Sequence, residues 1–148
     1  MDFKQPILND VQQAYYTCQK NWATINILVG RQKTRAAIDL AQTTLELAKK
    51  YELTEVIVNT SKILSLSYHL HRPLSMLGDE YAVLYKDAQA LLQIEYLAES
   101  LYDDLSKHFV KVKATQRNLQ PKALAHLAQL KPFCEKYVSY RLHLCTRL

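Results

Sequence analysis

The scarcity of helix-breaking residues limits what this chain can fold into more than any other feature of its sequence. Only two glycines and four prolines occur among 148 residues, whereas the two together usually make up roughly 12 per cent of a protein. No pair of alternating apolar and polar runs is joined by Asn-Gly or Asp-Gly, the strongest short signal of a β-hairpin. We therefore predict an all-α protein.

Proline, glycine and the apolar spacing indicate where the first helices begin and end. The expected helices run from about Pro6 to Val29, from Arg31 to about Tyr51 and from Thr54 to about His71. Gly30 is expected to end the first helix, and Thr54 to act as the N-cap of the third. The second helix carries small or apolar residues every three or four positions, which suits close packing. Those residues are Ala37, Ala41, Thr44, Leu45 and Ala48.

The second half of the chain holds a long uninterrupted helical pattern. Asp79 to Thr115 contains no glycine or proline and is 37 residues long, which exceeds the usual 8 to 20 residues of a globular helix. We expect two helices there, with a break near residues 90–95. A further helix is expected from Pro121 and another over Val138–Leu148. Altogether we expect about six or seven helices in one domain over residues 1–148.

Several classes of protein do not fit the composition. The longest stretch without a charged residue is Asn21–Gly30, far short of the roughly 18 apolar residues that span a membrane. The N-terminus lacks the pattern of a secretory signal, so we expect a cytoplasmic protein without a membrane partner. Three cysteines without a C-x-x-C pair are read as small buried residues, and we expect no metal and no other cofactor.

Residues 61–84 resemble a tetratricopeptide unit, in which helix A carries a Leu, a small residue and a Tyr. Leu64, Ser65 and Tyr68 match that pattern, and Leu77, Tyr81 and Leu84 take the positions of helix B. Ala41–Leu53 and other stretches also look like segments of uncharacterised bacterial proteins with such repeats. The resemblance implies antiparallel helix pairs stacked as a short right-handed superhelix. The chain could also be a fragment of a longer array.

The same resemblance implies a binding surface. In repeats of this class, the helix A residues that do not face the core line a concave groove that takes peptides. Carried onto this chain, the groove residues would be Asn59, Lys62, Leu66 and His69. The alternative is an ordinary solvated helix face. The resemblance thus favours a non-catalytic scaffold for protein–protein interaction.

No catalytic motif is present in the sequence. It contains no G-x-S-x-G, P-loop or G-x-G-x-x-G pattern. His69 and His71 are two residues apart, and this spacing points two helical side chains to different sides. We therefore predict that the chain is not an enzyme. The enzyme hypothesis would require a histidine to converge in space with a cysteine or a carboxylate.

Positive charge is concentrated in the C-terminal third. Residues 1–104 contain 10 Lys and Arg against 13 Asp and Glu, whereas residues 105–148 contain 9 against 1. An alternative function is therefore nucleic-acid binding through residues 105–147. The candidate basic patch consists of Lys107, Lys111, Lys113 and Arg117. The competing interpretation is a solvated face whose acidic partners lie on another segment.

The end of the chain combines tyrosines with apolar residues. Tyr137, Tyr140, Arg141 and Leu144 would form a partly exposed edge on a terminal helix. Tyr and Arg are frequent anchors of protein interfaces. The sequence therefore predicts a possible homodimer through the C-terminal helix.

Overall fold

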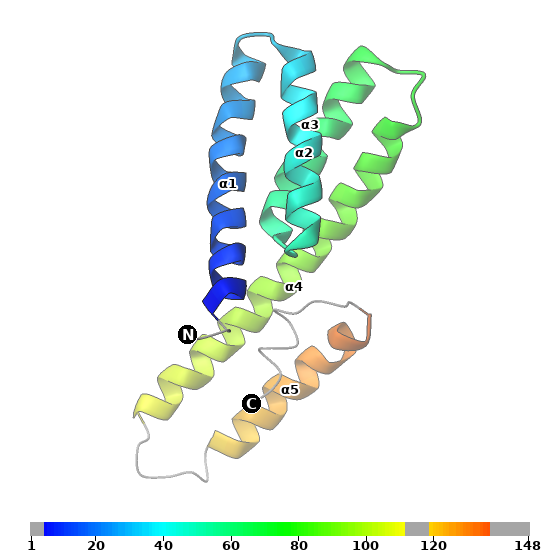
Figure 1. The fold of residues 1–148 in the computed structure, drawn as a ribbon. Coiled ribbons are helices and arrows are strands. Elements are labelled where there is room, and N and C mark those ends of the chain that lie inside the picture. The colour runs from blue at the N-terminus through cyan, green and yellow to red at the C-terminus, as the bar shows by residue number, and fades with distance from the viewer. Residues whose placement is uncertain (1–4, 112–118, 137–148) are drawn as a thin grey trace. The chain divides into compact units, whose positions relative to one another are not determined.

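The described part of the chain consists entirely of α-helices and their connections. The computed structural model describes residues 5–111 and 119–136, in which β-strands are absent and five helices follow one another. They are α1 (Gln5–Gly30), α2 (Thr34–Lys50), α3 (Thr54–His71), α4 (Leu77–Lys111) and α5 (Leu119–Lys136) (Figure 1). The predicted all-α class is confirmed. The number of helices beyond these five and the right-handed superhelix stay predictions.

The helices fall into two compact units, Met1–Gln89 and Ala90–Leu148, which we describe separately as unit 1 and unit 2. In unit 1, α1 packs against α2, α2 packs against α3, and α1 also touches α3. Consecutive helices of this unit run in opposite directions (Figure 1), as their short connections predict. The α1–α2 and α3–α4 connections consequently lie at the same end of unit 1.

The core of unit 1 is built around the small-faced helix α2. Its predicted stripe is confirmed, because all five residues are buried: Ala37, Ala41, Thr44, Leu45 and Ala48. Ile25 from α1 and Leu64 and Tyr68 from α3 complete the main cluster. The buried hydroxyl of Thr60 donates to the carbonyl of Val56 at 2.7 Å. Such bonds satisfy polar side chains within their own helix, so α2 and α3 can pack without unpaired hydroxyls.

Helix α1 ends through a non-glycine residue in the left-handed conformation. Gln32 has φ 57°, the N–H of Lys33 donates to Leu28 O at 2.8 Å, and the N–H of Gln32 donates to Val29 O at 3.0 Å. This is the Schellman arrangement. Gly30 is the last residue of α1, so the helix ends there as expected, but the left-handed residue is Gln32 and Gly30 has no positive φ. The helix continues past Val29 because a glycine can still adopt helical angles.

The end of α2 repeats this arrangement around Glu52, which has φ 53°. The N–H of Leu53 donates to Ala48 O at 2.9 Å, and the N–H of Glu52 donates to Lys49 O at 3.3 Å. The expected N-cap role of Thr54 was wrong. Leu53 holds the N-cap position, and Thr54 is the first residue of α3 and is buried. Leu53 therefore both completes the hydrogen bonds at the end of α2 and precedes the first residue of α3.

Replacing Gln32 with glycine is expected to stabilise the protein by about 0.5 kcal/mol, because glycine accepts a positive φ without the strain that a side chain causes. Chemical denaturation followed by circular dichroism measures the change. Gln13→Gly is the matched control, since Gln13 is exposed within α1. That control should lose about 1 kcal/mol. If Gln32→Gly lost as much free energy of unfolding as Gln13→Gly, the assignment of Gln32 to the left-handed position would be contradicted.

Helix α4 is one continuous helix of 35 residues. The expected break near residues 90–95 was wrong. Globular helices usually have 8 to 20 residues, whereas α4 is longer and contributes residues to both units. Its centre contains no glycine or proline that would interrupt it. Because α4 belongs to both units, the single domain over residues 1–148 stays a prediction.

Unit 2 pairs the second part of α4 with α5. Ile94 and Ala98 of α4 and Leu130 of α5 are buried together. Leu101 and Phe133 pack against them. Pro121 lies in the first turn of α5, where its missing N–H has no helical partner to lose. Pro132 lies inside the same helix, which continues to Lys136.

Candidate functional site

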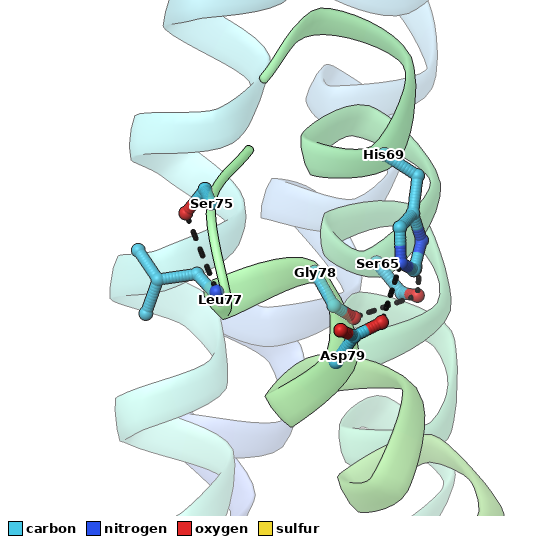
Figure 2. A network of polar contacts seen from close by, with 6 residues as sticks. All are labelled: Ser65, His69, Ser75, Leu77, Gly78 and Asp79. Atoms are coloured by element: carbon cyan, nitrogen blue, oxygen red, sulfur yellow. Dashed lines mark hydrogen bonds and ion pairs between the residues drawn. The ribbon is translucent and has the colours of Figure 1, made fainter. Parts of the chain in front are cut away.

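A serine, a histidine and an aspartate converge where α3 meets α4. His69 Nε2 lies 3.0 Å from Asp79 Oδ1, and His69 Nδ1 lies 3.4 Å from Ser65 Oγ. Ser65 Oγ also donates a hydrogen bond to the carbonyl of Gly78 at 3.2 Å. Figure 2 shows the histidine ring between the two helices, with Ser65 and Asp79 beside it. We call these three side chains the α3–α4 clasp.

The location of the clasp explains its geometry. His69 lies in the last turn of α3 and Asp79 in the first turn of α4, so each side chain can interact favourably with the dipole of its own helix. A Cβ atom on Gly78 would lie 3.0 to 3.3 Å from the atoms of the His69 ring. The ring therefore packs closely over Gly78. The absence of a side chain at residue 78 leaves room for it.

The clasp contains the residue types of a hydrolase triad but not its arrangement. Ser65 is only 9% exposed, and its proton is directed to the Gly78 carbonyl. Asp79 is on the open side of the ring, with 82% of its side chain exposed. A nucleophilic serine needs a base that takes its proton and a position that a substrate can reach. This geometry instead suits a connection between two helices.

The four predicted groove residues lie along one side of α3 at spacings of three and four, and we call them the α3 stripe. Asn59 is half-buried, whereas Lys62 and Leu66 are exposed. His69 is exposed too, but it is engaged with Asp79. The structure thus leaves Lys62 and Leu66 as the accessible part of the stripe. Asn59 and His69 mark its two ends.

The predicted basic patch is described only in part. Lys107 and Lys111 are exposed on α4, while Lys113 and Arg117 lie outside the described residues. Lys107, Lys111, Ser106 and Val110 line a hollow of about 320 Å³. Among the ion pairs of the described residues, none involves Lys107 or Lys111. Two cations of this patch are therefore available to an anionic ligand.

An acidic residue of unit 2 pairs with α5 rather than with the patch. Asp104 Oδ2 lies 3.0 Å from Lys122 Nζ and 3.7 Å from His126 Nε2. The hydrogen bond from Lys122 is the main cause that lowers the pKa of Asp104 below its ordinary value. Part of the positive charge of the C-terminal third is consequently balanced by an acidic residue of α4.

The Lys122→Ala variant is expected to raise the pKa of Asp104 toward its ordinary value, because the hydrogen bond that favours the charged form is removed. A carboxyl titration by NMR measures it. The folded-state pKa is lowered, so this pair contributes stability above the unfolded-state pKa of about 3.9 and loses it as pH falls through the folded pKa. Lys131→Ala, which removes an exposed lysine of α5, is the control. An unchanged pKa in Lys122→Ala would contradict the assignment.

Other predicted residues are either buried or outside the described part. Cys18 is fully buried, as expected, and burial raises the pKa of its thiol. The self-association candidates Tyr137, Tyr140, Arg141 and Leu144 lie outside the described residues. In the part that the structure describes, no group of histidine, cysteine and carboxylate side chains could hold a metal ion.

The structure also reveals a feature that the sequence interpretation missed. Several large apolar side chains are exposed at the α3–α4 connection, and we call Leu70, Leu74, Met76 and Leu77 the apolar tip. Apolar periodicity assigns Leu70 to the apolar face of its helix, but it is 76% exposed. It lies two residues after the buried Tyr68, and this spacing points the two side chains to different sides of α3. The signal in the sequence was a loop after Pro73 that is rich in leucine and methionine.

Helices long and apolar enough to cross a bilayer are not found in residues 5–111 and 119–136. Of the residues that were matched to a tetratricopeptide unit, Leu64 and Tyr68 belong to the main core cluster and Tyr81 and Leu84 pack against it, while Leu77 is exposed. Membership of that repeat class stays a prediction. Comparison of the chain with protein-family models, curated proteins and solved structures found no match.

Proposed function

We propose that this chain is a non-catalytic helical scaffold that binds a segment of another protein along the α3 stripe. The observation that carries the proposal is the pair Lys62 and Leu66, one turn apart and both exposed on a helix whose other side is packed against α2. Leu66 is 53% exposed. An accessible leucine beside a cation is a suitable anchor for an amphipathic segment with acidic residues.

The rigidity of the surrounding helices supports this role. The α3–α4 clasp joins the end of α3 to the start of α4. In addition, the Nε2 amide of Gln42 on α2 donates to the hydroxyls of Tyr68 at 3.0 Å and Tyr81 at 3.4 Å. These bonds join α2, α3 and α4 to one another. A surface that is already ordered loses little conformational entropy when a partner binds.

The proposal also assigns the clasp a structural rather than a catalytic role. A fluorophosphonate probe, which labels activated serines, is therefore expected to leave the protein unlabelled at Ser65. The Ser65→Ala variant provides the background signal for this measurement. Labelling of the original protein that disappears in Ser65→Ala would show an activated serine and would overturn the non-catalytic part of the proposal.

Affinity capture tests the binding part. A partner recovered with the original protein should be lost with Leu66→Asp, which places a negative charge at the proposed anchor. Glu46→Gln, an exposed position on α2, is the control and should retain the partner. Circular dichroism of both variants establishes that they are folded. Equal recovery with Leu66→Asp would show that the stripe is not the binding surface.

A second candidate function is nucleic-acid binding, which is favoured by the two available lysines of the basic patch. Lys107 and Lys111 share one face of α4 through their four-residue spacing. Binding through phosphate contacts would fall steeply with salt. Fluorescence anisotropy with DNA and RNA at low salt tests it, and Lys107→Gln with Lys111→Gln should weaken any binding. If no binding is measurable at low salt, this candidate fails.

A further inference from the structure

One end of unit 1 carries positive charge without any acidic residue in its two connections. The α1–α2 connection with its flanking residues, 26–36, contains Arg31, Lys33 and Arg35, and the α3–α4 side, residues 66–78, contains Arg72. Neither segment contains Asp or Glu. All four cationic residues are exposed. The two connections lie at the same end (Figure 1), so their charges act on the same side of the molecule.

The apolar tip projects from this same end. Leu74 is 99% exposed, Met76 is 79% exposed and Leu70 is 76% exposed. Isolated apolar side chains on a protein surface are ordinary, but a group of them in one short connection marks an interaction site. Side chains exposed to this degree stand out from the surface instead of lining a groove. They are therefore suited to insert into a lipid interface or into a cavity of a partner protein.

The backbone of the tip is ordered by its own hydrogen bonds. The N–H of Ser75 donates to Arg72 O at 2.9 Å, and the N–H of Leu77 donates to Ser75 Oγ at 3.3 Å (Figure 2). The N–H of Glu80 donates to Met76 O at 3.2 Å. Proline 73 has no N–H to satisfy. The cost of moving backbone into a less polar medium comes chiefly from unpaired polar groups, and these bonds reduce it.

We propose that this end of unit 1 docks on an anionic lipid surface, with the apolar tip inserted at the interface and the four cations against the lipid headgroups. Apolar side chains that enter the interface together with nearby Lys and Arg are the general requirements for peripheral membrane binding. A lipid surface suits the observations better than a peptide, because the tip projects and its cations are distributed over two connections. The surface adjoins the α3 stripe, because Leu70 lies one turn after Leu66, but it does not include Lys62 or Leu66.

The opposite end of unit 1 provides an internal comparison. Residues 46–55, around the α2–α3 connection, contain three glutamates against two lysines. Leu47 and Leu53 of this connection pack into the core with Cys18, Ala48 and Val56. This connection therefore lacks both the projecting apolar side chains and the excess of positive charge. The end of unit 1 with the α1–α2 and α3–α4 connections therefore differs from the α2–α3 connection in both its projecting apolar side chains and its positive charge.

Acidic residues next to the tip do not cancel its charge. Asp79 and Glu80 follow the tip in the first turn of α4. Asp79 also contacts His69, and these two acidic residues stand against the four cations Arg31, Lys33, Arg35 and Arg72. The expectation of no membrane partner was based on the lack of a spanning segment. Docking at the surface needs only a few side chains, so the proposal departs from that expectation.

Sedimentation with phosphatidylcholine vesicles, with and without phosphatidylserine, tests the proposal on the full chain. The original protein should bind only the vesicles that contain phosphatidylserine, and added salt should weaken the binding. Leu74→Asn with Met76→Asn should reduce the bound fraction at least about ten-fold. Arg31→Gln with Lys33→Gln and Arg35→Gln should reduce it similarly. Val83→Asn with Leu124→Asn, exposed apolar positions elsewhere, should bind like the original protein.

A second measurement reports insertion directly. The emission of a Leu74→Trp variant should shift to shorter wavelength when phosphatidylserine vesicles are added, after subtraction of the Trp22 signal of the original protein. The proposal is overturned if the original protein does not sediment with phosphatidylserine vesicles. It is also overturned if the tip variants bind as well as the control, or if the tryptophan emission does not shift. If the tip bound a protein instead of lipid, the original protein would not sediment with phosphatidylserine vesicles.

Discussion

Replacing Leu64 with alanine is expected to destabilise the protein by about 3 kcal/mol, the typical loss for a buried leucine. Leu64 is completely buried and belongs to the main core cluster with Ile25, Leu45 and Tyr68. Three helices contribute to this cluster, so no single side chain can move to fill the space. The loss therefore includes both the transfer of apolar atoms to water and the cavity that remains.

Denaturant unfolding monitored by circular dichroism measures this loss. Leu66→Ala is the matched control, because Leu66 is on the same helix and is 53% exposed. It should change the free energy of unfolding by less than about 0.5 kcal/mol. Similar losses for the two variants would show that Leu64 is not at the centre of the core.

Enlarging Ala41 to leucine is expected to destabilise the protein by about 2 kcal/mol. Ala41 is fully buried on α2 and belongs to the same cluster as Ile25 and Leu64. Its small size allows α2 to approach its neighbours closely. A leucine would force the helices apart or force side chains out of their preferred rotamers, because protein cores are packed at the density of crystals.

The control for this variant is Ala36→Leu on the same helix, where the alanine is exposed. Alanine and leucine have similar helix propensities, so the control separates packing from propensity. The thermal midpoint should fall clearly in Ala41→Leu and change little in Ala36→Leu. If the two variants melted alike, α2 would not pack as closely as the structure indicates.

The helical class and the face of α2 were predictable from local sequence. Spacing of small residues at three and four positions identified Ala37, Ala41 and Ala48, and all are buried. The end of α3 at His71 was also predicted, because Pro73 restricts the residue before it. These features depend on residues close in sequence. Periodicity and proline chemistry were sufficient for them.

Features that depend on distant residues were not predictable in this way. The resemblance places His69 in a groove, but its contact with Asp79 depends on how the α3–α4 connection folds back. Local sequence gives Asp79 no feature beyond that of a solvated surface residue. The continuity of α4 was missed because the expected break was based only on the usual length of a globular helix, while no glycine or proline interrupts its centre. Leu70 was misassigned although it lies two residues after the buried Tyr68, a spacing that points the two side chains to different sides of the helix.

The most direct test of the scaffold function is site-specific photo-crosslinking in cells. A photoreactive phenylalanine analogue placed at residue 66 lies on the α3 stripe, and the same analogue at residue 46 lies on the exposed side of α2. We expect a defined protein to be crosslinked from residue 66 and not from residue 46. No protein crosslinked from residue 66, or the same proteins from both positions, would contradict the proposed function.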